Sequence, residues 1–117
     1  MTDPSAILIG LERIKLRFLS LLDDRLDELE LQIDDIALPH RRAHALSRVQ
    51  AEAHKIAGTA SVVGFSELGR IAAVVDSSIE KMSTSEYDEK TIGQIQAQVD
   101  QLIEIGVLAI RSQPATT

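Results

Sequence analysis

Histidine is the residue type in this chain best suited to chemistry at neutral pH, because a neutral imidazole is both a nucleophile and a proton acceptor. The sequence contains three histidines, at positions 40, 44 and 54. His54 directly follows Ala53, which belongs to a helical stripe of apolar residues. The spacing predicts that the His54 ring lies at the edge of the buried face and still reaches solvent. The alternative interpretation is a partly buried histidine with a structural role.

His40 and His44 are four residues apart and share one face of a predicted helix. Two histidines at this spacing can ligate a metal ion, but a zinc site needs three or four protein ligands. The sequence has no HExxH motif, no cysteine and no carboxylate placed beside this pair. We therefore expect no metal site and no bound cofactor, and we interpret His40 and His44 as exposed residues at a helix start.

Gly58 lies one helical turn after His54 on the same face. Glycine inside a helix costs about 1 kcal/mol relative to alanine, so helix formation does not favour it there. We expect Gly58 to leave space beside the imidazole. The alternatives are that the glycine is incidental, or that it ends the helix with a positive φ angle.

Asp76 is predicted to face His54 across a helical hairpin that turns at Gly64. His54 lies ten residues before Gly64 and Asp76 twelve after it, so at about 1.5 Å of rise per residue their heights differ by about 3 Å. Asp76 follows the apolar Val75 as His54 follows Ala53. A carboxylate there would accept a hydrogen bond from one ring nitrogen, directly or through water, and leave the other nitrogen free. The alternative is a solvated carboxylate.

The elements that must position these residues are helices. Apolar residues recur at alternating steps of three and four, and no convincing stretch alternates with period two. This pattern predicts an all-α, antiparallel up-down four-helix bundle. We expect one domain over residues 1–111 and a flexible tail over 112–117. We also expect a monomer, because closing the bundle uses the apolar stripes. The stripes span 7–36, 46–63, 65–82 and 92–109.

The first stripe slips in phase by one residue near Leu22, which predicts an N-terminal helical extension, a bend or two helices end to end. Its members are Ile7, Leu11, Ile14, Phe18, Leu22, Leu26, Leu29, Ile33 and Ile36. Capping and turn residues separate the helices. They are Thr2 or Asp3 before Pro4, Pro39 between the first two helices, Gly64 after the second, and Ser85 or Asp88 before the fourth.

Composition excludes several classes of partner. The net charge of −6 and the presence of only three aromatic residues argue against nucleic acid, since an acidic surface repels phosphates. No apolar run approaches the about 18 residues that span a bilayer, and the N-terminus lacks the basic region of a signal peptide. We expect no membrane partner, and the absence of cysteine fits a cytoplasmic protein.

Charge is distributed unevenly between the first two predicted helices. Seven acidic residues lie between Asp23 and Asp35, whereas the second helix has Glu52 as its only acid. The second helix carries Arg41, Arg42, Arg48 and Lys55 as well as the histidines. These are either solvated faces of opposite sign, or the second helix presents a basic face to an acidic partner.

The run Ala53-His54-Lys55-Ile56-Ala57-Gly58-Thr59-Ala60, followed by Gly64-Phe65 and Leu68, resembles the signature of histidine-containing phosphotransfer (HPt) domains. The four predicted helices extend the similarity over nearly the whole chain. The resemblance implies a helical bundle that carries a phosphoryl group on one exposed histidine, here His54. It also implies exchange of that group with an aspartate of a response-regulator receiver domain, and a sensor histidine kinase as a further partner.

The sequence departs from the family pattern at Ala57, where many members have a lysine that helps to hold the phosphoryl group. Lys55 lies about 100° around the helix from the histidine, and whether it takes over that role stays open. Asp76 matches the acidic residue that the family often has on the following helix. We expect Arg48, Ala57 and Ser61 to contact the partner.

The sequence has no GxxxxGK[ST] loop and no acidic cluster that we assign to Mg²⁺, so we do not expect an ATP-dependent enzyme. The resemblance implies a phosphocarrier whose partner supplies Mg²⁺ and the acid–base groups. Two alternatives are a helical adaptor that docks a partner through the second helix, and a stand-alone enzyme or metal protein. Met1 and the tail favour a free-standing protein over a fragment of a larger kinase.

Overall fold

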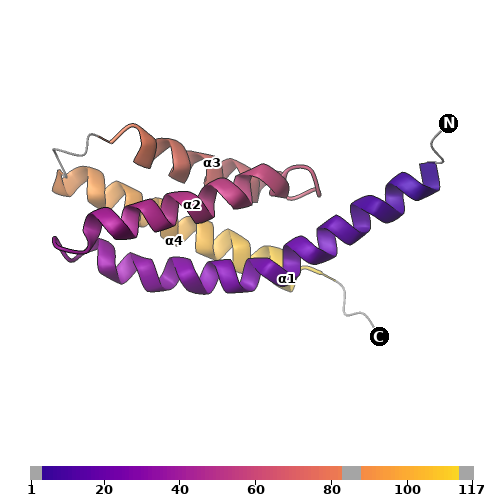
Figure 1. Cartoon of the computed structure of the whole chain (residues 1–117), viewed down its shortest axis with the longest axis horizontal. Coiled ribbons are helices and arrows are strands. Elements are labelled where there is room, and N and C mark those ends of the chain that lie inside the picture. The colour runs from indigo at the N-terminus through magenta and orange to yellow at the C-terminus, as the bar shows by residue number, and fades with distance from the viewer. Residues whose placement is uncertain (1–3, 83–87, 114–117) are drawn as a thin grey trace.

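The computed structural model describes residues 4–82 and 88–113. It contains four helices, and no strand is present in these two ranges, so the prediction of an all-α fold with four helices is confirmed. Figure 1 shows that successive helices run in opposite directions along the long axis. The helices are α1 (Pro4–Ile36), α2 (Arg42–Ala60), α3 (Ser66–Glu80) and α4 (Glu89–Arg111).

The helices form a ring in which each one contacts two others. α1 packs against α2 and α4, and α3 packs against the same two helices. α1 and α3 therefore lie diagonally opposite each other across the core. α2 and α3 form the hairpin that carries His54 and Asp76.

The core follows the apolar stripes, most fully in α4. All six residues of its predicted stripe are buried: Ile92, Ile95, Val99, Leu102, Gly106 and Ala109. Gly106 allows α4 to approach α1 closely, because a Cβ added to it would lie 2.7 Å from Leu26 Cδ2. That distance is well inside the optimal separation of about 3.5–4.0 Å between packed carbon atoms.

The first half of α1 differs from the prediction. α1 is one continuous helix, but its buried residues begin at Phe18. Ile7, Leu11 and Ile14, expected in the core, are 50%, 38% and 46% exposed. α1 has 33 residues whereas α2 has 19 and α4 has 23, so its N-terminal turns change direction and project beyond the bundle (Figure 1). We expected a monomer because closing the bundle would bury the whole stripe, but these three residues are not buried in the bundle.

Two capping predictions are confirmed and one boundary differs. Pro4 begins α1, and the Asp88 side chain caps α4 by accepting a hydrogen bond from the Lys90 backbone N–H. α2 begins at Arg42, so His40 lies in the preceding turn rather than on the helix. The expected caps Thr2, Asp3 and Ser85, and residues 114–117 of the expected tail, lie outside the described residues.

The turn between α2 and α3 is longer than the sequence suggested. α2 ends at Ala60, and Gly64 caps its C-terminal end as predicted, with a φ of 99°. The Phe65 N–H donates to the Ala60 carbonyl oxygen at 2.8 Å, and the Gly64 N–H donates to that of Ser61 at 3.4 Å, which is the Schellman pattern. Glycine adopts this left-handed region without the steric penalty of a Cβ. Val63, Phe65 and Met82, expected in the core stripes, are partly buried and lie outside the helices, because the chain is already turning at these positions.

Candidate functional site

His54 lies in the second half of α2 with its side chain 79% exposed. The adjacent Ala53 is fully buried, as is Ile56. The core therefore fixes the backbone of this turn while the imidazole stands outside it. This is the position at the edge of the buried face that the apolar spacing predicted.

Asp76 on α3 contacts the imidazole from the neighbouring helix. His54 Nδ1 lies 2.9 Å from Asp76 Oδ2. An ionised carboxylate can only accept hydrogen bonds, so Nδ1 is the donor in this contact. In the neutral ring the proton then resides on Nδ1, and Nε2 carries a free lone pair. The contact expected between these two residues is present, and it leaves Nε2 as the ring nitrogen with a lone pair.

Gln50 and Glu80 extend this contact, and the sequence analysis missed both. Gln50 Nε2 donates to Asp76 Oδ1 at 3.1 Å and to Glu80 Oε2 at 2.6 Å. Gln50 precedes His54 by four residues, and Glu80 follows Asp76 by four. Residues at this spacing share a helix face, so polar residues four positions from each candidate were the signal that could have found them.

The Asp76 carboxylate is more buried than its partner, with 25% of its side chain exposed. The hydrogen bond from His54 holds the pKa of Asp76 below its ordinary value, and the hydrogen bond from Gln50 acts in the same direction, against the effect of burial. Asp76 is thus ionised at neutral pH. A fixed negative charge beside the ring stabilises any positive charge that the ring acquires.

A shallow open groove between α2 and α3 contains these side chains. Its lining includes His54, Asp76 and Glu80 together with two cations, Lys55 and Lys81. An open groove of this kind does not enclose a small ligand as most small-molecule pockets do. It suits a reacting group that another protein delivers.

Lys55 and Ala57 flank the histidine in different ways. Lys55 is 56% exposed in its side chain, and its Nζ lies 3.8 Å from Glu52 Oε1. Ala57 is partly buried against the core. Position 57 therefore offers no cation, and the ammonium nearest to His54 in sequence is held loosely by an acid of its own helix.

Gly58 lies within α2, is exposed and does not have a positive φ angle. The interpretation of Gly58 as a left-handed helix terminus is therefore wrong. A Cβ added to Gly58 would meet no atom within 4 Å. The imidazole is thus not crowded by this position, and a requirement for glycine would come from a group outside the chain.

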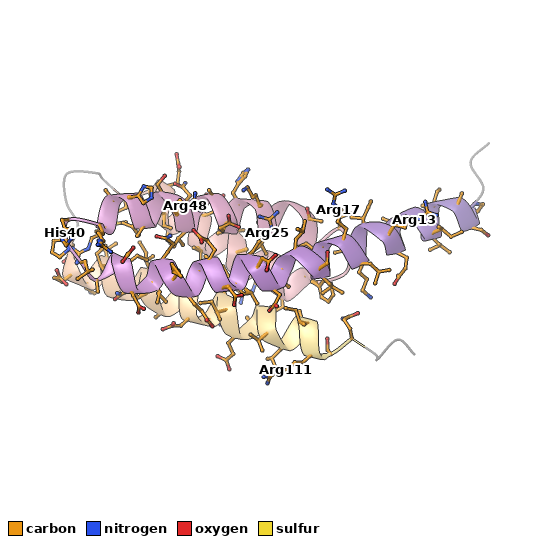
Figure 2. The ribbon with its side chains drawn as sticks, turned by 60° about the horizontal axis from the view of Figure 1, so that its bottom comes forward. Arg13, Arg17, Arg25, His40, Arg48 and Arg111 are labelled. Carbon is orange, nitrogen blue, oxygen red and sulfur yellow. The ribbon has the colours of Figure 1, made fainter. Side chains whose placement is uncertain are left out.

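Cations at the start of α2 and on its α1 side pair with acids of α1. Arg48 Nη2 and Nε lie 2.7 and 3.2 Å from Glu28 Oε1. Arg41 Nη1 lies 3.5 Å from Asp35 Oδ1. Figure 2 shows Arg48 and Arg25 along the α1–α2 side of the molecule. The uneven charges of these two helices thus meet each other, and neither face is simply solvated.

Arg42 is not part of any basic surface, contrary to the expectation for the second helix. It is buried, and its Nε donates to the Ile36 carbonyl oxygen at 2.7 Å. Its Nη1 also lies 3.7 Å from Glu89 Oε1. The last carbonyl groups of a helix lack partners within the helix, so Arg42 caps the C-terminal end of α1.

The structure therefore brings together only part of the expected site. His54, Asp76 and Lys55 share the groove, whereas Arg48 faces α1 and Ser61 is exposed beyond the end of α2. His40 and His44 are exposed. In the part of the chain that the structure describes, no three His, Asp or Glu side chains gather as ligands for a metal ion.

Comparison with known proteins identifies one family. Residues 13–105 match the family model described as Hpt domain. Searches of curated proteins and of solved structures find no significant match. Within residues 4–82 and 88–113, no helix combines the length and the apolar character needed to cross a membrane.

Proposed function

The chain belongs to the Hpt domain family, and on that premise we propose that His54 is its phosphoryl carrier. Members of this family carry phosphoryl groups on histidine in phosphorelays, and they are carriers rather than catalysts. They interact with receiver domains and histidine kinases. In this proposal His54 accepts the group from a receiver aspartate or from a kinase and passes it to a receiver aspartate.

The hydrogen bond between His54 Nδ1 and Asp76 Oδ2 is the observation that carries the proposal. The Nε2 lone pair forms a bond to phosphorus as the bond from phosphorus to the donor's carboxyl oxygen breaks. The donor aspartate leaves as a carboxylate, while the imidazole keeps its Nδ1 proton and gains one positive charge. Asp76 offsets this charge in the transition state and in the product. Transfer onward is the reverse of this step with a second aspartate.

The charge of the phosphoryl group must also be balanced. A phosphoryl group carries about two negative charges at neutral pH. We propose that Lys55 and Lys81, the cations of the groove, attract it. We further propose that the receiver domain supplies Mg²⁺ and the acid–base groups. The lack of a nucleotide-binding loop in the sequence fits this division of roles.

We propose that the partner docks over the groove and reaches Arg48, Ala57 and Ser61 at its margins. Arg48 and Ser61 are exposed, and Gly58 leaves a gap in the side-chain layer between them. Because a carrier must release each partner after transfer, we expect a small, transient interface.

Phosphorus NMR of the chain after incubation with a phosphorylated receiver domain tests the proposal. We expect a single acid-labile phosphate on Nε2 of His54, and none on the His54→Gln variant. His44→Gln removes an exposed histidine of the same helix and is the matched control, which should be phosphorylated normally. Circular dichroism checks that both variants fold.

Two outcomes would contradict the proposal. Phosphate on the His54→Gln variant would place the carrier elsewhere. Binding to receivers without any uptake of phosphate would instead support the helical adaptor.

A further inference from the structure

The first turns of α1, residues 4–17, have little cover from the rest of the described chain, although Lys15 Nζ lies 5.7 Å from the centroid of the Phe65 ring. None of residues 4–17 is buried. Ile9 and Leu16 in this segment are 55% and 54% exposed. Isolated helices shorter than about 12–15 residues are marginal in water, and monomers rarely expose contiguous apolar surface. Ile9 and Leu16 thus offer apolar surface to a partner.

The two halves of α1 carry opposite charge. Residues 4–21 contain three cations and one acid, whereas residues 22–36 contain seven acids and one cation. Arg13 and Arg17 lie in the first half, and Figure 2 shows Arg13 on the part that projects past the other helices. Among the residues that the structure describes, Arg13, Arg17, Asp24 and Asp27 form no ion pair within the chain.

One row of exposed residues on α1 has the same spacing when it is followed from either end. The steps along it are four, three, four, four, three and four residues, with Ser20 at the centre. At 3.6 residues per turn, this row lies on the side of α1 opposite to its buried residues. We call it the outer row. Its members are Ile9, Arg13, Leu16, Ser20, Asp24, Asp27 and Leu31, all exposed.

We propose that the outer row is the interface of a homodimer in which two α1 helices pack antiparallel about Ser20. This register places Arg13 against the partner's Asp27. It places Leu16 against the partner's Asp24, with Arg17 beside that carboxylate. It also places Ile9 against the partner's Leu31. Each contact occurs twice, because an interface with twofold symmetry pairs the same surface with itself. The projecting half of each α1 then lies along the bundle half of the other.

The charge pattern selects this partner and this direction. A parallel pair would place Arg13 beside Arg13 and Asp27 beside Asp27, and like charges in contact are destabilising. An anionic membrane would attract the first half of α1 but repel the seven acids of the second half. A second copy in the antiparallel direction offers both halves a complementary surface.

The dimer leaves the histidine accessible. α1 and α3 lie diagonally opposite in the bundle, and the outer row faces away from the core. The groove between α2 and α3 is therefore open on both copies. The dimer does not depend on the proposed function, because its test measures the mass of the protein in solution and not phosphoryl transfer.

Sedimentation velocity over a range of concentrations, at low and high salt, tests the dimer. We expect the mass to double with concentration, and the dissociation constant to rise at high salt because ion pairs contribute. Arg13→Asp and Asp27→Arg should each weaken association at least tenfold. An equal mixture of these two variants should restore it, since opposite charges then face each other again at both contacts between positions 13 and 27. Lys90→Asp is the control with the same change in charge as Arg13→Asp, and it should associate normally.

Several results would overturn the dimer. They are a monomer at every concentration, a dimer that neither charge reversal weakens, or a mixture of the two variants that stays monomeric. A monomer in solution that co-sediments with vesicles of phosphatidylcholine and phosphatidylglycerol would assign the apolar half of α1 to a membrane instead. Arg17→Asp with Asp24→Arg gives an independent exchange should a first variant fail to fold.

Discussion

Asp76 is held in place by two residues of the opposite helix, and one of them, His54, is the side chain that it orients. Its Oδ2 lies 2.9 Å from His54 Nδ1, while its Oδ1 accepts from Gln50. The carboxylate is mostly buried and the imidazole is mostly exposed. The pair therefore joins a fixed acceptor to a ring whose second nitrogen is open to solvent.

Removal of the Asp76 carboxylate should change the proton position on His54 and slow the reaction. With Asp76→Ala we expect phosphoryl transfer to fall about tenfold without stopping, because the carboxylate orients the ring and balances its charge but forms no bond to phosphorus. Nitrogen NMR should find the proton on Nδ1 in the native chain and largely on Nε2 in the variant. A slower variant with the native tautomer would mean that Asp76 acts by stability alone.

The same pair makes a contribution to stability that depends on pH. The pKa of Asp76 is lowered in the folded chain, mainly by the hydrogen bond from His54. A lowered pKa stabilises the fold above the unfolded-state value of about 3.9, and this contribution disappears as pH falls through the folded-state value. We expect the free energy of unfolding in urea to be higher for the native chain than for Asp76→Asn at pH 7. This gap in free energy should narrow below about pH 4. A gap that stays constant down to pH 3 would exclude this linkage.

Gly58 allows fold and function to be separated. Because an added Cβ meets no atom, Gly58→Ala should raise the free energy of unfolding by up to about 1 kcal/mol. Transfer should slow only modestly with Ala and steeply with Gly58→Glu, which places an anion where the phosphoryl group approaches. Gly93, in α4, is equally uncrowded. Gly93→Ala should therefore give the same gain in stability with no change in transfer.

A loss of stability in Gly58→Ala would show that the space around this residue is not free. Normal transfer by Gly58→Glu would show that no partner approaches there. Thermal melts and transfer assays on the same samples distinguish these results.

Lys55 should act on association with the receiver through charge. We expect Lys55→Ala to weaken binding several-fold at low salt, and the effect to fade as ionic strength rises, because the Lys55 side chain is more than half exposed. Lys90→Ala removes an exposed cation from α4 and serves as the control. Calorimetry at two salt concentrations gives the comparison, and an effect independent of salt would exclude electrostatic attraction.

The core of the bundle was predictable where each helix has neighbours along its full length. In α4 every residue of the apolar stripe is buried. In α1 the same periodicity continues through Ile7, Leu11 and Ile14, which are exposed. Periodicity reports which face of a helix is apolar, and it carries no information about where the neighbouring helices end.

The candidate site was predictable where it depends on the distance of a residue from the turn, measured along the axes of the two helices of the hairpin. Counting residues from the turn paired His54 with Asp76, and the two side chains are in contact. Counting did not pair Gln50 with Glu80, although both lie four residues from a candidate. The uneven distribution of charge also wrongly predicted an open surface for Arg42, because the end of α1 that Arg42 caps is fixed by tertiary packing.

The turn formed by residues 61–65 joins the two helices that supply the whole hydrogen-bonded chain from Glu80 to His54. α1 and α4 contribute none of its donors or acceptors, and they support it by burying apolar surface. The side chains hydrogen-bonded around His54 thus all come from a single helical hairpin, α2 and α3 with their turn. Any pair of helices that buries the apolar stripes of this hairpin can therefore support it. Changes on the outer surfaces of α1 and α4 therefore leave the hydrogen bonds of the imidazole unaltered.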